Sequence, residues 1–113
     1  MEIVRKDETE KRVNGPLTAF EYVTKDTDIN GAVTIKNGRF PEKGWVYNEV
    51  AKELIYVIEG SGTLGLRDRT VSFAAGDVII IEPKEEYYWD CTATLFVAAT
   101  PPWTLEQHKI LPN

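Results

Sequence analysis

The amino-acid sequence predicts an all-β sandwich or barrel. Apolar residues recur along the chain with a period near two rather than near 3.6, which is typical of strands. Glycine, proline, asparagine and aspartate separate the apolar runs, and these residues favour turns. The run at residues 78–81 is apolar throughout, so we expect both faces of that strand to be covered, inside a barrel or against a second sheet.

The first part of the chain is expected to form four strands. They are residues 2–5, 19–24, 31–37 and 44–50. Each run is short, and turn-forming residues lie between one run and the next. This spacing leaves little room for a helix of ordinary length.

The second part of the chain is expected to form six strands. They are residues 53–59, 62–67, 70–74, 77–81, 86–91 and 94–99. Gly60 and Gly62 can supply the positive φ that a tight hairpin needs, and the polar segment 67–69 reverses the chain. Gly76 separates two further runs and Pro83 ends the strand before it. Strands joined by such turns pair antiparallel.

The tail changes character after residue 100. Two prolines end the last strand, and residues 104–110 are expected to form a short helical turn capped by Thr104. Trp103 is expected to anchor the tail against the barrel. We therefore expect one domain over residues 1–113, with a core at about 31–100, N-terminal strands within 1–30 and a tail at 101–113.

Charge and composition narrow the classes of function. The 113-residue chain has a formal net charge of −5 and a pI near 4.9, so its field repels phosphate backbones and anionic lipid. No nucleic acid or membrane partner is expected, and the N-terminal segment lacks an apolar signal region. The single cysteine, Cys91, makes no internal disulfide and is consistent with a cytoplasmic protein.

Two segments carry a family resemblance. They are KELIYVIEGSGTL at residues 52–64 and AAGDVIIIEPKEEYYW at residues 74–89. Six residues separate Glu53 from Gly60, as in the first motif of the cupin superfamily, and Gly76, Asp77 and Pro83 match the frame of the second motif. The chain thus resembles a cupin over about residues 31–100. The resemblance implies a double-stranded β-helix, or jelly-roll barrel.

The metal ligands of the family are missing at the matching positions. In most cupins these ligands are histidines and a glutamate that hold iron, manganese, nickel or zinc. The histidine positions fall on Tyr47 and Glu49 or, with the longer spacing, on Val46 and Asn48, and in the second motif on Tyr88. Only Glu53 remains of the ligand set, and Glu85 replaces the usual glycine of the second motif. We therefore expect neither the usual metal nor any other cofactor.

Strand parity gives an expected lining for the barrel. Alternate side chains of a strand share a face, so Trp45, Tyr47 and Glu49 form one set and Glu53, Ile55 and Val57 form another. If the family frame holds, both sets face inward. Glu53 can then be protonated and donate to a carbonyl or to Asn48, accept from the Tyr47 or Tyr88 hydroxyl, or bind a hard cation together with Glu49.

The resulting hypothesis is a small cupin that binds an organic ligand, such as a sugar or a carboxylic acid, without the usual metal. The expected ligand-binding residues are Trp45, Tyr47, Asn48, Glu49, Glu53 and Tyr88, with Glu53 and Tyr88 as the catalytic pair if it is an enzyme. Trp89 is expected to pack, and His108, the only histidine, to be a solvated tail side chain.

Three alternatives stay open. One is a metal-free isomerase or epimerase that uses acid and base groups, and another is a metal-dependent oxygenase or isomerase built on Glu49, Glu53 and a tyrosinate or water. The third is a purely structural domain, which predicts a barrel filled by side chains. The resemblance also implies a homodimer, because small cupins commonly pair.

Overall fold

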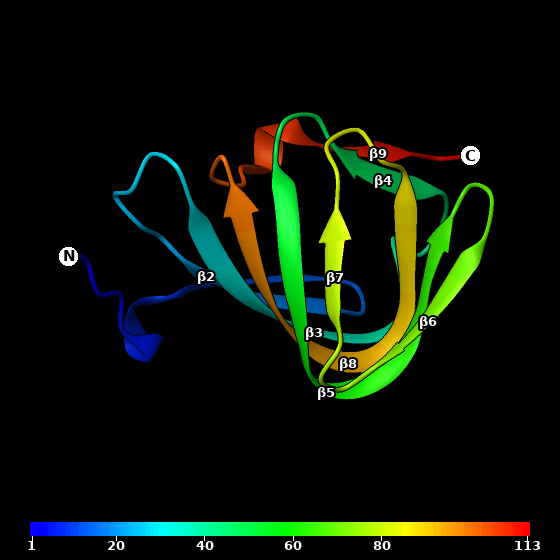
Figure 1. Cartoon of the computed structure of the whole chain (residues 1–113), viewed down its shortest axis with the longest axis horizontal. Helices are drawn as coiled ribbons and strands as arrows, with labels where there is room; N and C mark the ends of the chain where they lie inside the picture. Colours follow the sequence, from blue (N-terminus) through cyan, green and yellow to red (C-terminus); the bar gives the residue numbers. More distant parts are fainter.

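The computed structural model describes all 113 residues, and its nine strands form one curled, antiparallel sheet (Figure 1). The strands are β1 (Glu10–Asn14), β2 (Leu17–Tyr22), β3 (Asn30–Phe40), β4 (Trp45–Asn48), β5 (Lys52–Leu66), β6 (Thr70–Ala74), β7 (Val78–Ile81), β8 (Tyr87–Thr100) and β9 (His108–Leu111). The helical segments are two 3-10 turns, Lys6–Glu8 and Leu105–Gln107. The predicted all-β fold is confirmed. Neither turn has the length or apolar character needed to cross a membrane.

Strand β8 is the centre of the sheet. It pairs with β3 along one edge and with β5 along the other. β2 and β1 extend the sheet beyond β3, while β6 and β7 each pair with β5. β4 joins β8 at Val46 and carries β9 on its other edge. Figure 1 shows the sheet curling over on itself, with β4 and β9 at one end of the curl.

The core lies on the inner face of the curl. Along β8 every second side chain is buried, including Tyr87, Trp89 and Leu95, while Asp90 and Phe96 between them are exposed. This alternation is what period two requires of a sheet with one covered face. The buried apolar cluster is Phe40, Val46, Ile55, Val57, Leu64, Phe73, Ile81, Tyr87, Trp89, Cys91, Ala93 and Leu95.

The hairpin predicted at residues 60–62 is wrong. Residues 53–59 and 62–67 belong to one strand, β5, which stays paired with β8 on both sides of a register shift between Val57 and Glu59. The extra residue is a β-bulge, which bends a strand without reversing it. Gly60, one residue beyond the shift, has φ +89° but stays paired with Ala93 of β8, so its positive φ does not reverse the chain.

Other boundaries also differ from the sequence-based prediction. Residues 86–91 and 94–99 are one strand, β8, because no residue between them breaks the pairing. Residues 2–5 form no strand, and the first strand is the charged segment β1. In the tail, Thr104 precedes a 3-10 turn without a side-chain capping bond, and β9 follows it. The reversal at 67–69 is confirmed, since Leu66 N–H donates to the Arg69 carbonyl at 2.7 Å.

The outer face of β7 is not covered within the chain. Val78 and Ile80 are 57% and 54% exposed, whereas Ile81 is buried. The expectation that both faces of residues 78–81 are covered is therefore wrong for a single copy of the chain. The curl is one layer thick at this place, so only the inner side chains reach the core.

Candidate functional site

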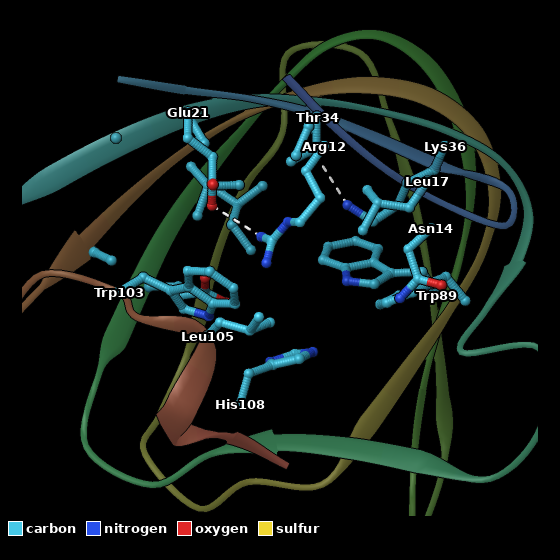
Figure 2. A pocket seen from close by; sticks show the side chains of 18 of the residues that line it. Arg12, Asn14, Leu17, Glu21, Thr34, Lys36, Trp89, Trp103, Leu105 and His108 are labelled. Atoms are coloured by element: carbon cyan, nitrogen blue, oxygen red, sulfur yellow. Dashed lines mark hydrogen bonds and ion pairs between the residues drawn. The ribbon is translucent and has the colours of Figure 1, made fainter. Parts of the chain in front are cut away.

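A cavity of about 310 Å³ opens inside the curl, at the end where β1, β2 and the C-terminal tail meet (Figure 2). Its volume is near the lower end of the range for small-molecule sites, ~300–1,000 Å³. Its polar lining residues are Arg12, Asn14, Glu21, Asn30, Thr34, Lys36, Glu53, Tyr87, Trp103 and His108. A purely structural domain predicts a filled barrel, and the cavity argues against that alternative.

Lys36 places an ammonium group in the wall of this cavity. Lys36 is only 5% exposed, and its Nζ donates to Thr34 Oγ1 at 2.9 Å. The Nζ also lies 4.9 Å from the centre of the Trp89 ring. No ion pair joins it to a carboxylate. Burial lowers the pKa of Lys36 to about 8, and the nearby Cys91 and Glu53 offset part of that effect.

Glu53 lies in the same wall, on the inner face of β5. It is 9% exposed, and the Tyr87 hydroxyl approaches its Oε1 at 3.5 Å. Burial raises the pKa of Glu53, while the charge of Lys36 and the side chains of Asn48 and Tyr87 lower it in part. Burial and the Glu53 charge also raise the pKa of Tyr87 well above its ordinary value. Glu53 and Lys36 therefore each favour the neutral form more than they do in water.

Arg12 reaches the cavity from β1. Its Nη2 is 2.8 Å from Glu21 Oε2 on the neighbouring strand β2, and its guanidinium lies 4.6 Å from the centre of the Trp103 ring. In Figure 2, Arg12 points into the pocket between the rings of Trp103 and Trp89. The ion pair and the aromatic contact hold the guanidinium in place, and its remaining donors are available to a ligand.

The C-terminal tail closes one side of the cavity. Trp103 N–H donates to Asn30 Oδ1 at 2.9 Å, and Asn30 Nδ2 donates to the Trp103 carbonyl at 3.1 Å. Gln107 Oε1 accepts from the backbone N–H groups of Val50 and Ala51 at 3.1 and 2.7 Å. The expectation that Trp103 anchors the tail is thus met, and the anchored tail delivers Leu105 and His108 to the cavity.

His108 is not the solvated side chain expected from the sequence. It is half-buried, its Nδ1 lies 2.9 Å from Asn48 Oδ1, and its ring stacks on Phe40 with 6.4 Å between ring centres. Burial lowers the pKa of His108 to about 4, and the nearby charges of Arg12 and Lys36 add to the effect. The ring is therefore neutral near pH 7.

The sequence-predicted site residues divide into two groups. Glu53 faces the cavity, as expected, and Asn48 is buried beside it with 1% exposure. Trp45, Tyr47, Glu49 and Tyr88 do not line the cavity. Glu49 instead forms an exposed ion pair with Lys109 at 3.2 Å.

Trp45 and Tyr88 meet on the outside of the barrel. Their ring centres are 5.2 Å apart in an edge-to-face arrangement, with the Arg39 guanidinium over Tyr88 and that of Arg67 over Trp45. Gly65 lies beneath Tyr88, and a Cβ on that glycine would overlap the Tyr88 ring. This stack is packing between strands, so the expected inward orientation of Trp45 and Tyr88 is wrong.

The orientation error is a shift of one residue in each motif. Val46 and Asn48, the positions given by the longer spacing, face inward in place of Trp45, Tyr47 and Glu49. On β8, Tyr87 faces inward in place of Tyr88. Because side chains alternate along a strand, a shift of one residue exchanges the two faces.

Sequence reasoning missed Lys36, Arg12 and His108. Lys36 stands in the segment AVTIKNG, where the apolar and polar positions do not show which face is inner. Arg12 belongs to a charged segment without an apolar pattern, and His108 to a tail with no strand pattern. The one available signal was the parity of Lys36 with Thr34 and Ala32, which places all three on one face.

The residues at the family's metal positions do not fit a transition-metal ion. In the observed register these positions hold Val46, Asn48, Glu53 and Tyr87. Val46 offers no donor atom, and Asn48 Oδ1 already lies within hydrogen-bond distance of Trp103 Nε1 and His108 Nδ1. Tyr87 keeps its proton, and Lys36 adds positive charge beside Glu53. No three His, Cys, Asp or Glu side chains cluster to hold a metal ion, so the proposed set of Glu49, Glu53 and a tyrosinate does not come together.

Comparison with known proteins identifies one family. The sequence matches the cupin domain family over residues 32–97, more than half of the chain. No curated protein matches the sequence.

Solved structures of the same fold include several enzymes. A nucleoside dehydratase, known from Streptomyces, is similar with a TM-score of 0.88 at 14% identity, over 99% of this chain and 92% of the other. Ectoine synthase from P. lautus gives 0.77 at 16% identity, over 98% and 90% of the two chains. The polyketide cyclase RemF from Streptomyces resistomycificus gives 0.71 at 19% identity, over 88% and 79%. At these identities the likeness concerns the fold alone.

Proposed function

This chain belongs to the cupin family, and from that premise we propose that its cavity binds a small organic molecule and catalyses a proton-transfer step on it without a metal ion. The step is of the kind found in eliminations and isomerisations, where a proton leaves carbon and negative charge develops on oxygen. The proposal needs a cavity of the right size, a group that stabilises the oxygen, and groups that exchange protons.

The observation that carries the proposal is the buried ammonium of Lys36. Its single hydrogen bond, to Thr34, leaves two of its three N–H donors without a protein partner in the cavity wall. A buried, incompletely paired charge costs free energy of folding, so an ordinary structural site would avoid it. In a catalytic site the same charge stabilises an oxygen that becomes negative, and a fixed donor at low dielectric does this well.

Glu53 adds a second exchangeable proton near Lys36. Burial raises the pKa of Glu53 and lowers that of Lys36, so the difference between the two pKa values is smaller than in water. Pairs of groups whose environments shift their pKa values are typical of acid–base sites. In the neutral form, Glu53 donates a proton to a departing hydroxyl group, while the Lys36 ammonium holds the carbonyl oxygen.

The lining favours a ring compound that carries oxygen acceptors. Trp89, Trp103 and Phe40 supply flat apolar surfaces, and Arg12 and Lys36 supply donors for a carboxylate, a carbonyl or hydroxyl groups. Sugars, sugar acids and nucleosides share these features. The nucleoside dehydratase of the same fold has been studied with uridine, which supports including nucleosides among the candidates.

A binding screen tests the first half of the proposal. We expect small sugars, carboxylic acids and nucleosides, added to ¹⁵N-labelled protein, to shift amide signals of β2, β3 and the tail. Ala32→Trp is the matched control, because Ala32 lies on the inner face of β3 and a larger side chain there fills the cavity. Binding that occurs elsewhere, or that is unchanged in Ala32→Trp, contradicts the proposal.

Proton exchange in D₂O separates an enzyme from a binding module. For compounds that bind in the cavity, we expect the protein to exchange a C–H proton next to a carbonyl, or to remove water, as followed by ¹H NMR. If compounds bind but none of them exchanges or reacts, the chain is a binding module and the catalytic half of the proposal is wrong.

A further inference from the structure

We propose that His108 is the proton acceptor of this site, and that Asn48 is the positioning residue that holds its ring in the tautomer this role requires. The inference rests on the proposed function, because it assigns the base of the same cavity. It starts from the hydrogen bonds of Asn48, whose amide is buried at the end of β4.

The Trp103 indole fixes the orientation of the Asn48 amide. Trp103 Nε1 lies 3.0 Å from Asn48 Oδ1, and an indole nitrogen is a donor only. The Asn48 atom that faces it must therefore be the oxygen, because the amide NH₂ would place two donors against each other. The Nδ2 atom points away and has no hydrogen-bond partner, although the amide lies close enough to Glu53 to favour its ionised form.

The oriented amide then fixes the tautomer of His108. The same Oδ1 lies 2.9 Å from His108 Nδ1, and an amide oxygen only accepts, so Nδ1 carries the proton. In a neutral ring the other nitrogen, Nε2, is then bare. The ring is neutral because it is half-buried, stacked on Phe40 and close to the cations Arg12 and Lys36.

The bare nitrogen is available to a ligand. His108 lines the cavity, and no hydrogen bond joins its Nε2 to the protein. Figure 2 shows the His108 ring pointing into the pocket that Arg12 and Trp89 also enter. The three elements that fix the ring are the tail, β4 and the Phe40 end of β3, so the acceptor stands on a defined support rather than on a free tail.

The positions of His108, Lys36 and Glu53 indicate how the proton would move. His108 Nε2 takes a proton from a carbon next to a carbonyl. The electron pair of that C–H bond forms a C=C bond to the carbonyl carbon, and the C=O π pair moves onto the oxygen, which faces Lys36. When the carbonyl re-forms, the C=C pair shifts to make a double bond to the carbon on the other side, which loses hydroxide, and Glu53 protonates the hydroxide to water. His108 then returns its proton through solvent to Glu53, so the ligand has lost one molecule of water in total.

NMR of the imidazole nitrogens tests the tautomer directly. His108 is the only histidine of the chain, so a long-range ¹H–¹⁵N spectrum of untagged protein needs no assignment by mutation. We expect protonated Nδ1 and bare Nε2 at pH 7, with no protonation of the ring until near pH 4. A proton on Nε2 at pH 7 overturns the proposal.

Two variants test the role of Asn48. Asn48→Leu removes the acceptor at similar volume, and we expect the proton to move to Nε2; Asn48→Asp keeps the acceptor and should keep Nδ1 protonated while raising the pH of titration. If Asn48→Leu does not fold, Trp103→Phe replaces it as the test. Without the indole donor the Asn48 amide is free to flip, and we expect His108 Nδ1 to lose its proton in part. An unchanged tautomer in the folded variants overturns the role of Asn48.

The exchange assay tests the role of His108. We expect His108→Gln to slow C–H exchange by ~10²–10⁴-fold, the usual contribution of a general base, while binding of the same compound changes less than about threefold. Exchange at the wild-type rate overturns the proposal. If no compound exchanges even with wild-type protein, the catalytic proposal fails, and the tautomer spectrum still shows independently whether the ring is held as described.

Discussion

Lys36 is the residue at which stability and function are expected to oppose each other. Burial lowers its pKa to about 8 from 10.5, so the folded protein keeps the ammonium at neutral pH against its environment. We predict that Lys36→Met raises the free energy of unfolding at pH 7 by roughly 1–3 kcal/mol, because the uncharged side chain has a similar length. Urea denaturation measures the change.

The pH dependence provides the control for Lys36. A lowered pKa means that the wild-type side chain contributes most stability above pH 10.5 and loses that contribution as the pH falls toward 8. The advantage of Lys36→Met should therefore shrink as the pH rises from 8 to 10. A variant that is less stable than wild type at pH 7 would show that the ammonium is well paired after all.

His108 gives a second prediction, in acid. Its pKa of about 4 in the fold lies below the ordinary 6.5, so the unfolded chain takes up a proton first, and stability falls as the pH drops from 6.5 to 4. The loss is roughly 3 kcal/mol at most. In His108→Gln it should vanish, and the difference between the two proteins, measured by urea denaturation, isolates it.

Other groups are shared by the two proteins and cancel in this difference. Glu53 acts with the opposite sign, because its raised pKa gives stability below pH 4.5 that is lost as the pH rises through its folded pKa. A difference that stays constant between pH 6.5 and 4 would mean that His108 is not held neutral.

Some of the cavity residues could be predicted from the sequence and others could not. The Glu–Gly spacing located Glu53 correctly, because a motif frame fixes the distance between positions along one strand. It placed Tyr88 where Tyr87 faces inward, and it did not decide between Tyr47 and Asn48, since a shift of one residue exchanges the two faces of the sheet. Arg12 and His108 come from segments at the two ends of the chain, and only the folded sheet shows that they meet.

Among the elements, β5 approaches its partner β8 closely at Gly60. Gly60 has φ +89° just after the bulge, and a Cβ there would overlap the Thr92 carbonyl on β8. Gly76 has a similar φ of +94°, but a Cβ there would meet nothing within 4 Å. Comparing alanine substitutions at the two glycines therefore distinguishes the cost of backbone strain from the cost of steric overlap.

We predict that Gly60→Ala costs more stability than Gly76→Ala. Strain alone should cost roughly 1–2 kcal/mol at Gly76, and overlap should add roughly 1–3 kcal/mol at Gly60. Thermal unfolding of the two variants gives the comparison. Equal losses would mean that β8 moves aside easily, and that the bulge is not held tightly.

The elements also show why local signals misled. Gly60 and Gly62 look like a hairpin because spaced glycines are typical of a tight turn, and only the unbroken pairing with β8 shows that the strand continues through them. β9 lacks a strand pattern of its own and forms because β4 offers it an edge. A strand that forms because a neighbouring strand pairs with it cannot be predicted from its own local sequence.

At the scale of the whole molecule, the outer face of the sheet is apolar as well as the inner one. Leu54 lies opposite Ile80, and Tyr56 opposite both Val78 and Phe96, so these exposed side chains form one continuous patch on β5, β7 and β8. Monomeric proteins seldom leave such a patch uncovered. A second copy of the chain is the partner that the family resemblance leads us to expect.

We predict a homodimer that buries this patch. Sedimentation at micromolar concentration should give twice the mass of the chain, and Ile80→Lys, which places a charge at the centre of the patch, should give a folded monomer. A control charge at Val13, exposed on β1 away from the patch, should leave the dimer intact. A wild-type monomer would contradict this prediction without affecting the cavity.

In the proposed function, the side chains of the cavity, rather than a bound metal ion, move the proton. The most direct test is the rate of C–H exchange in D₂O for a cavity-binding compound, measured with and without a strong chelator, for wild type and Lys36→Met. We predict that the chelator leaves the wild-type rate unchanged and that Lys36→Met abolishes exchange while remaining folded. Exchange that the chelator removes, or that persists in Lys36→Met, would contradict the proposed metal-free proton transfer.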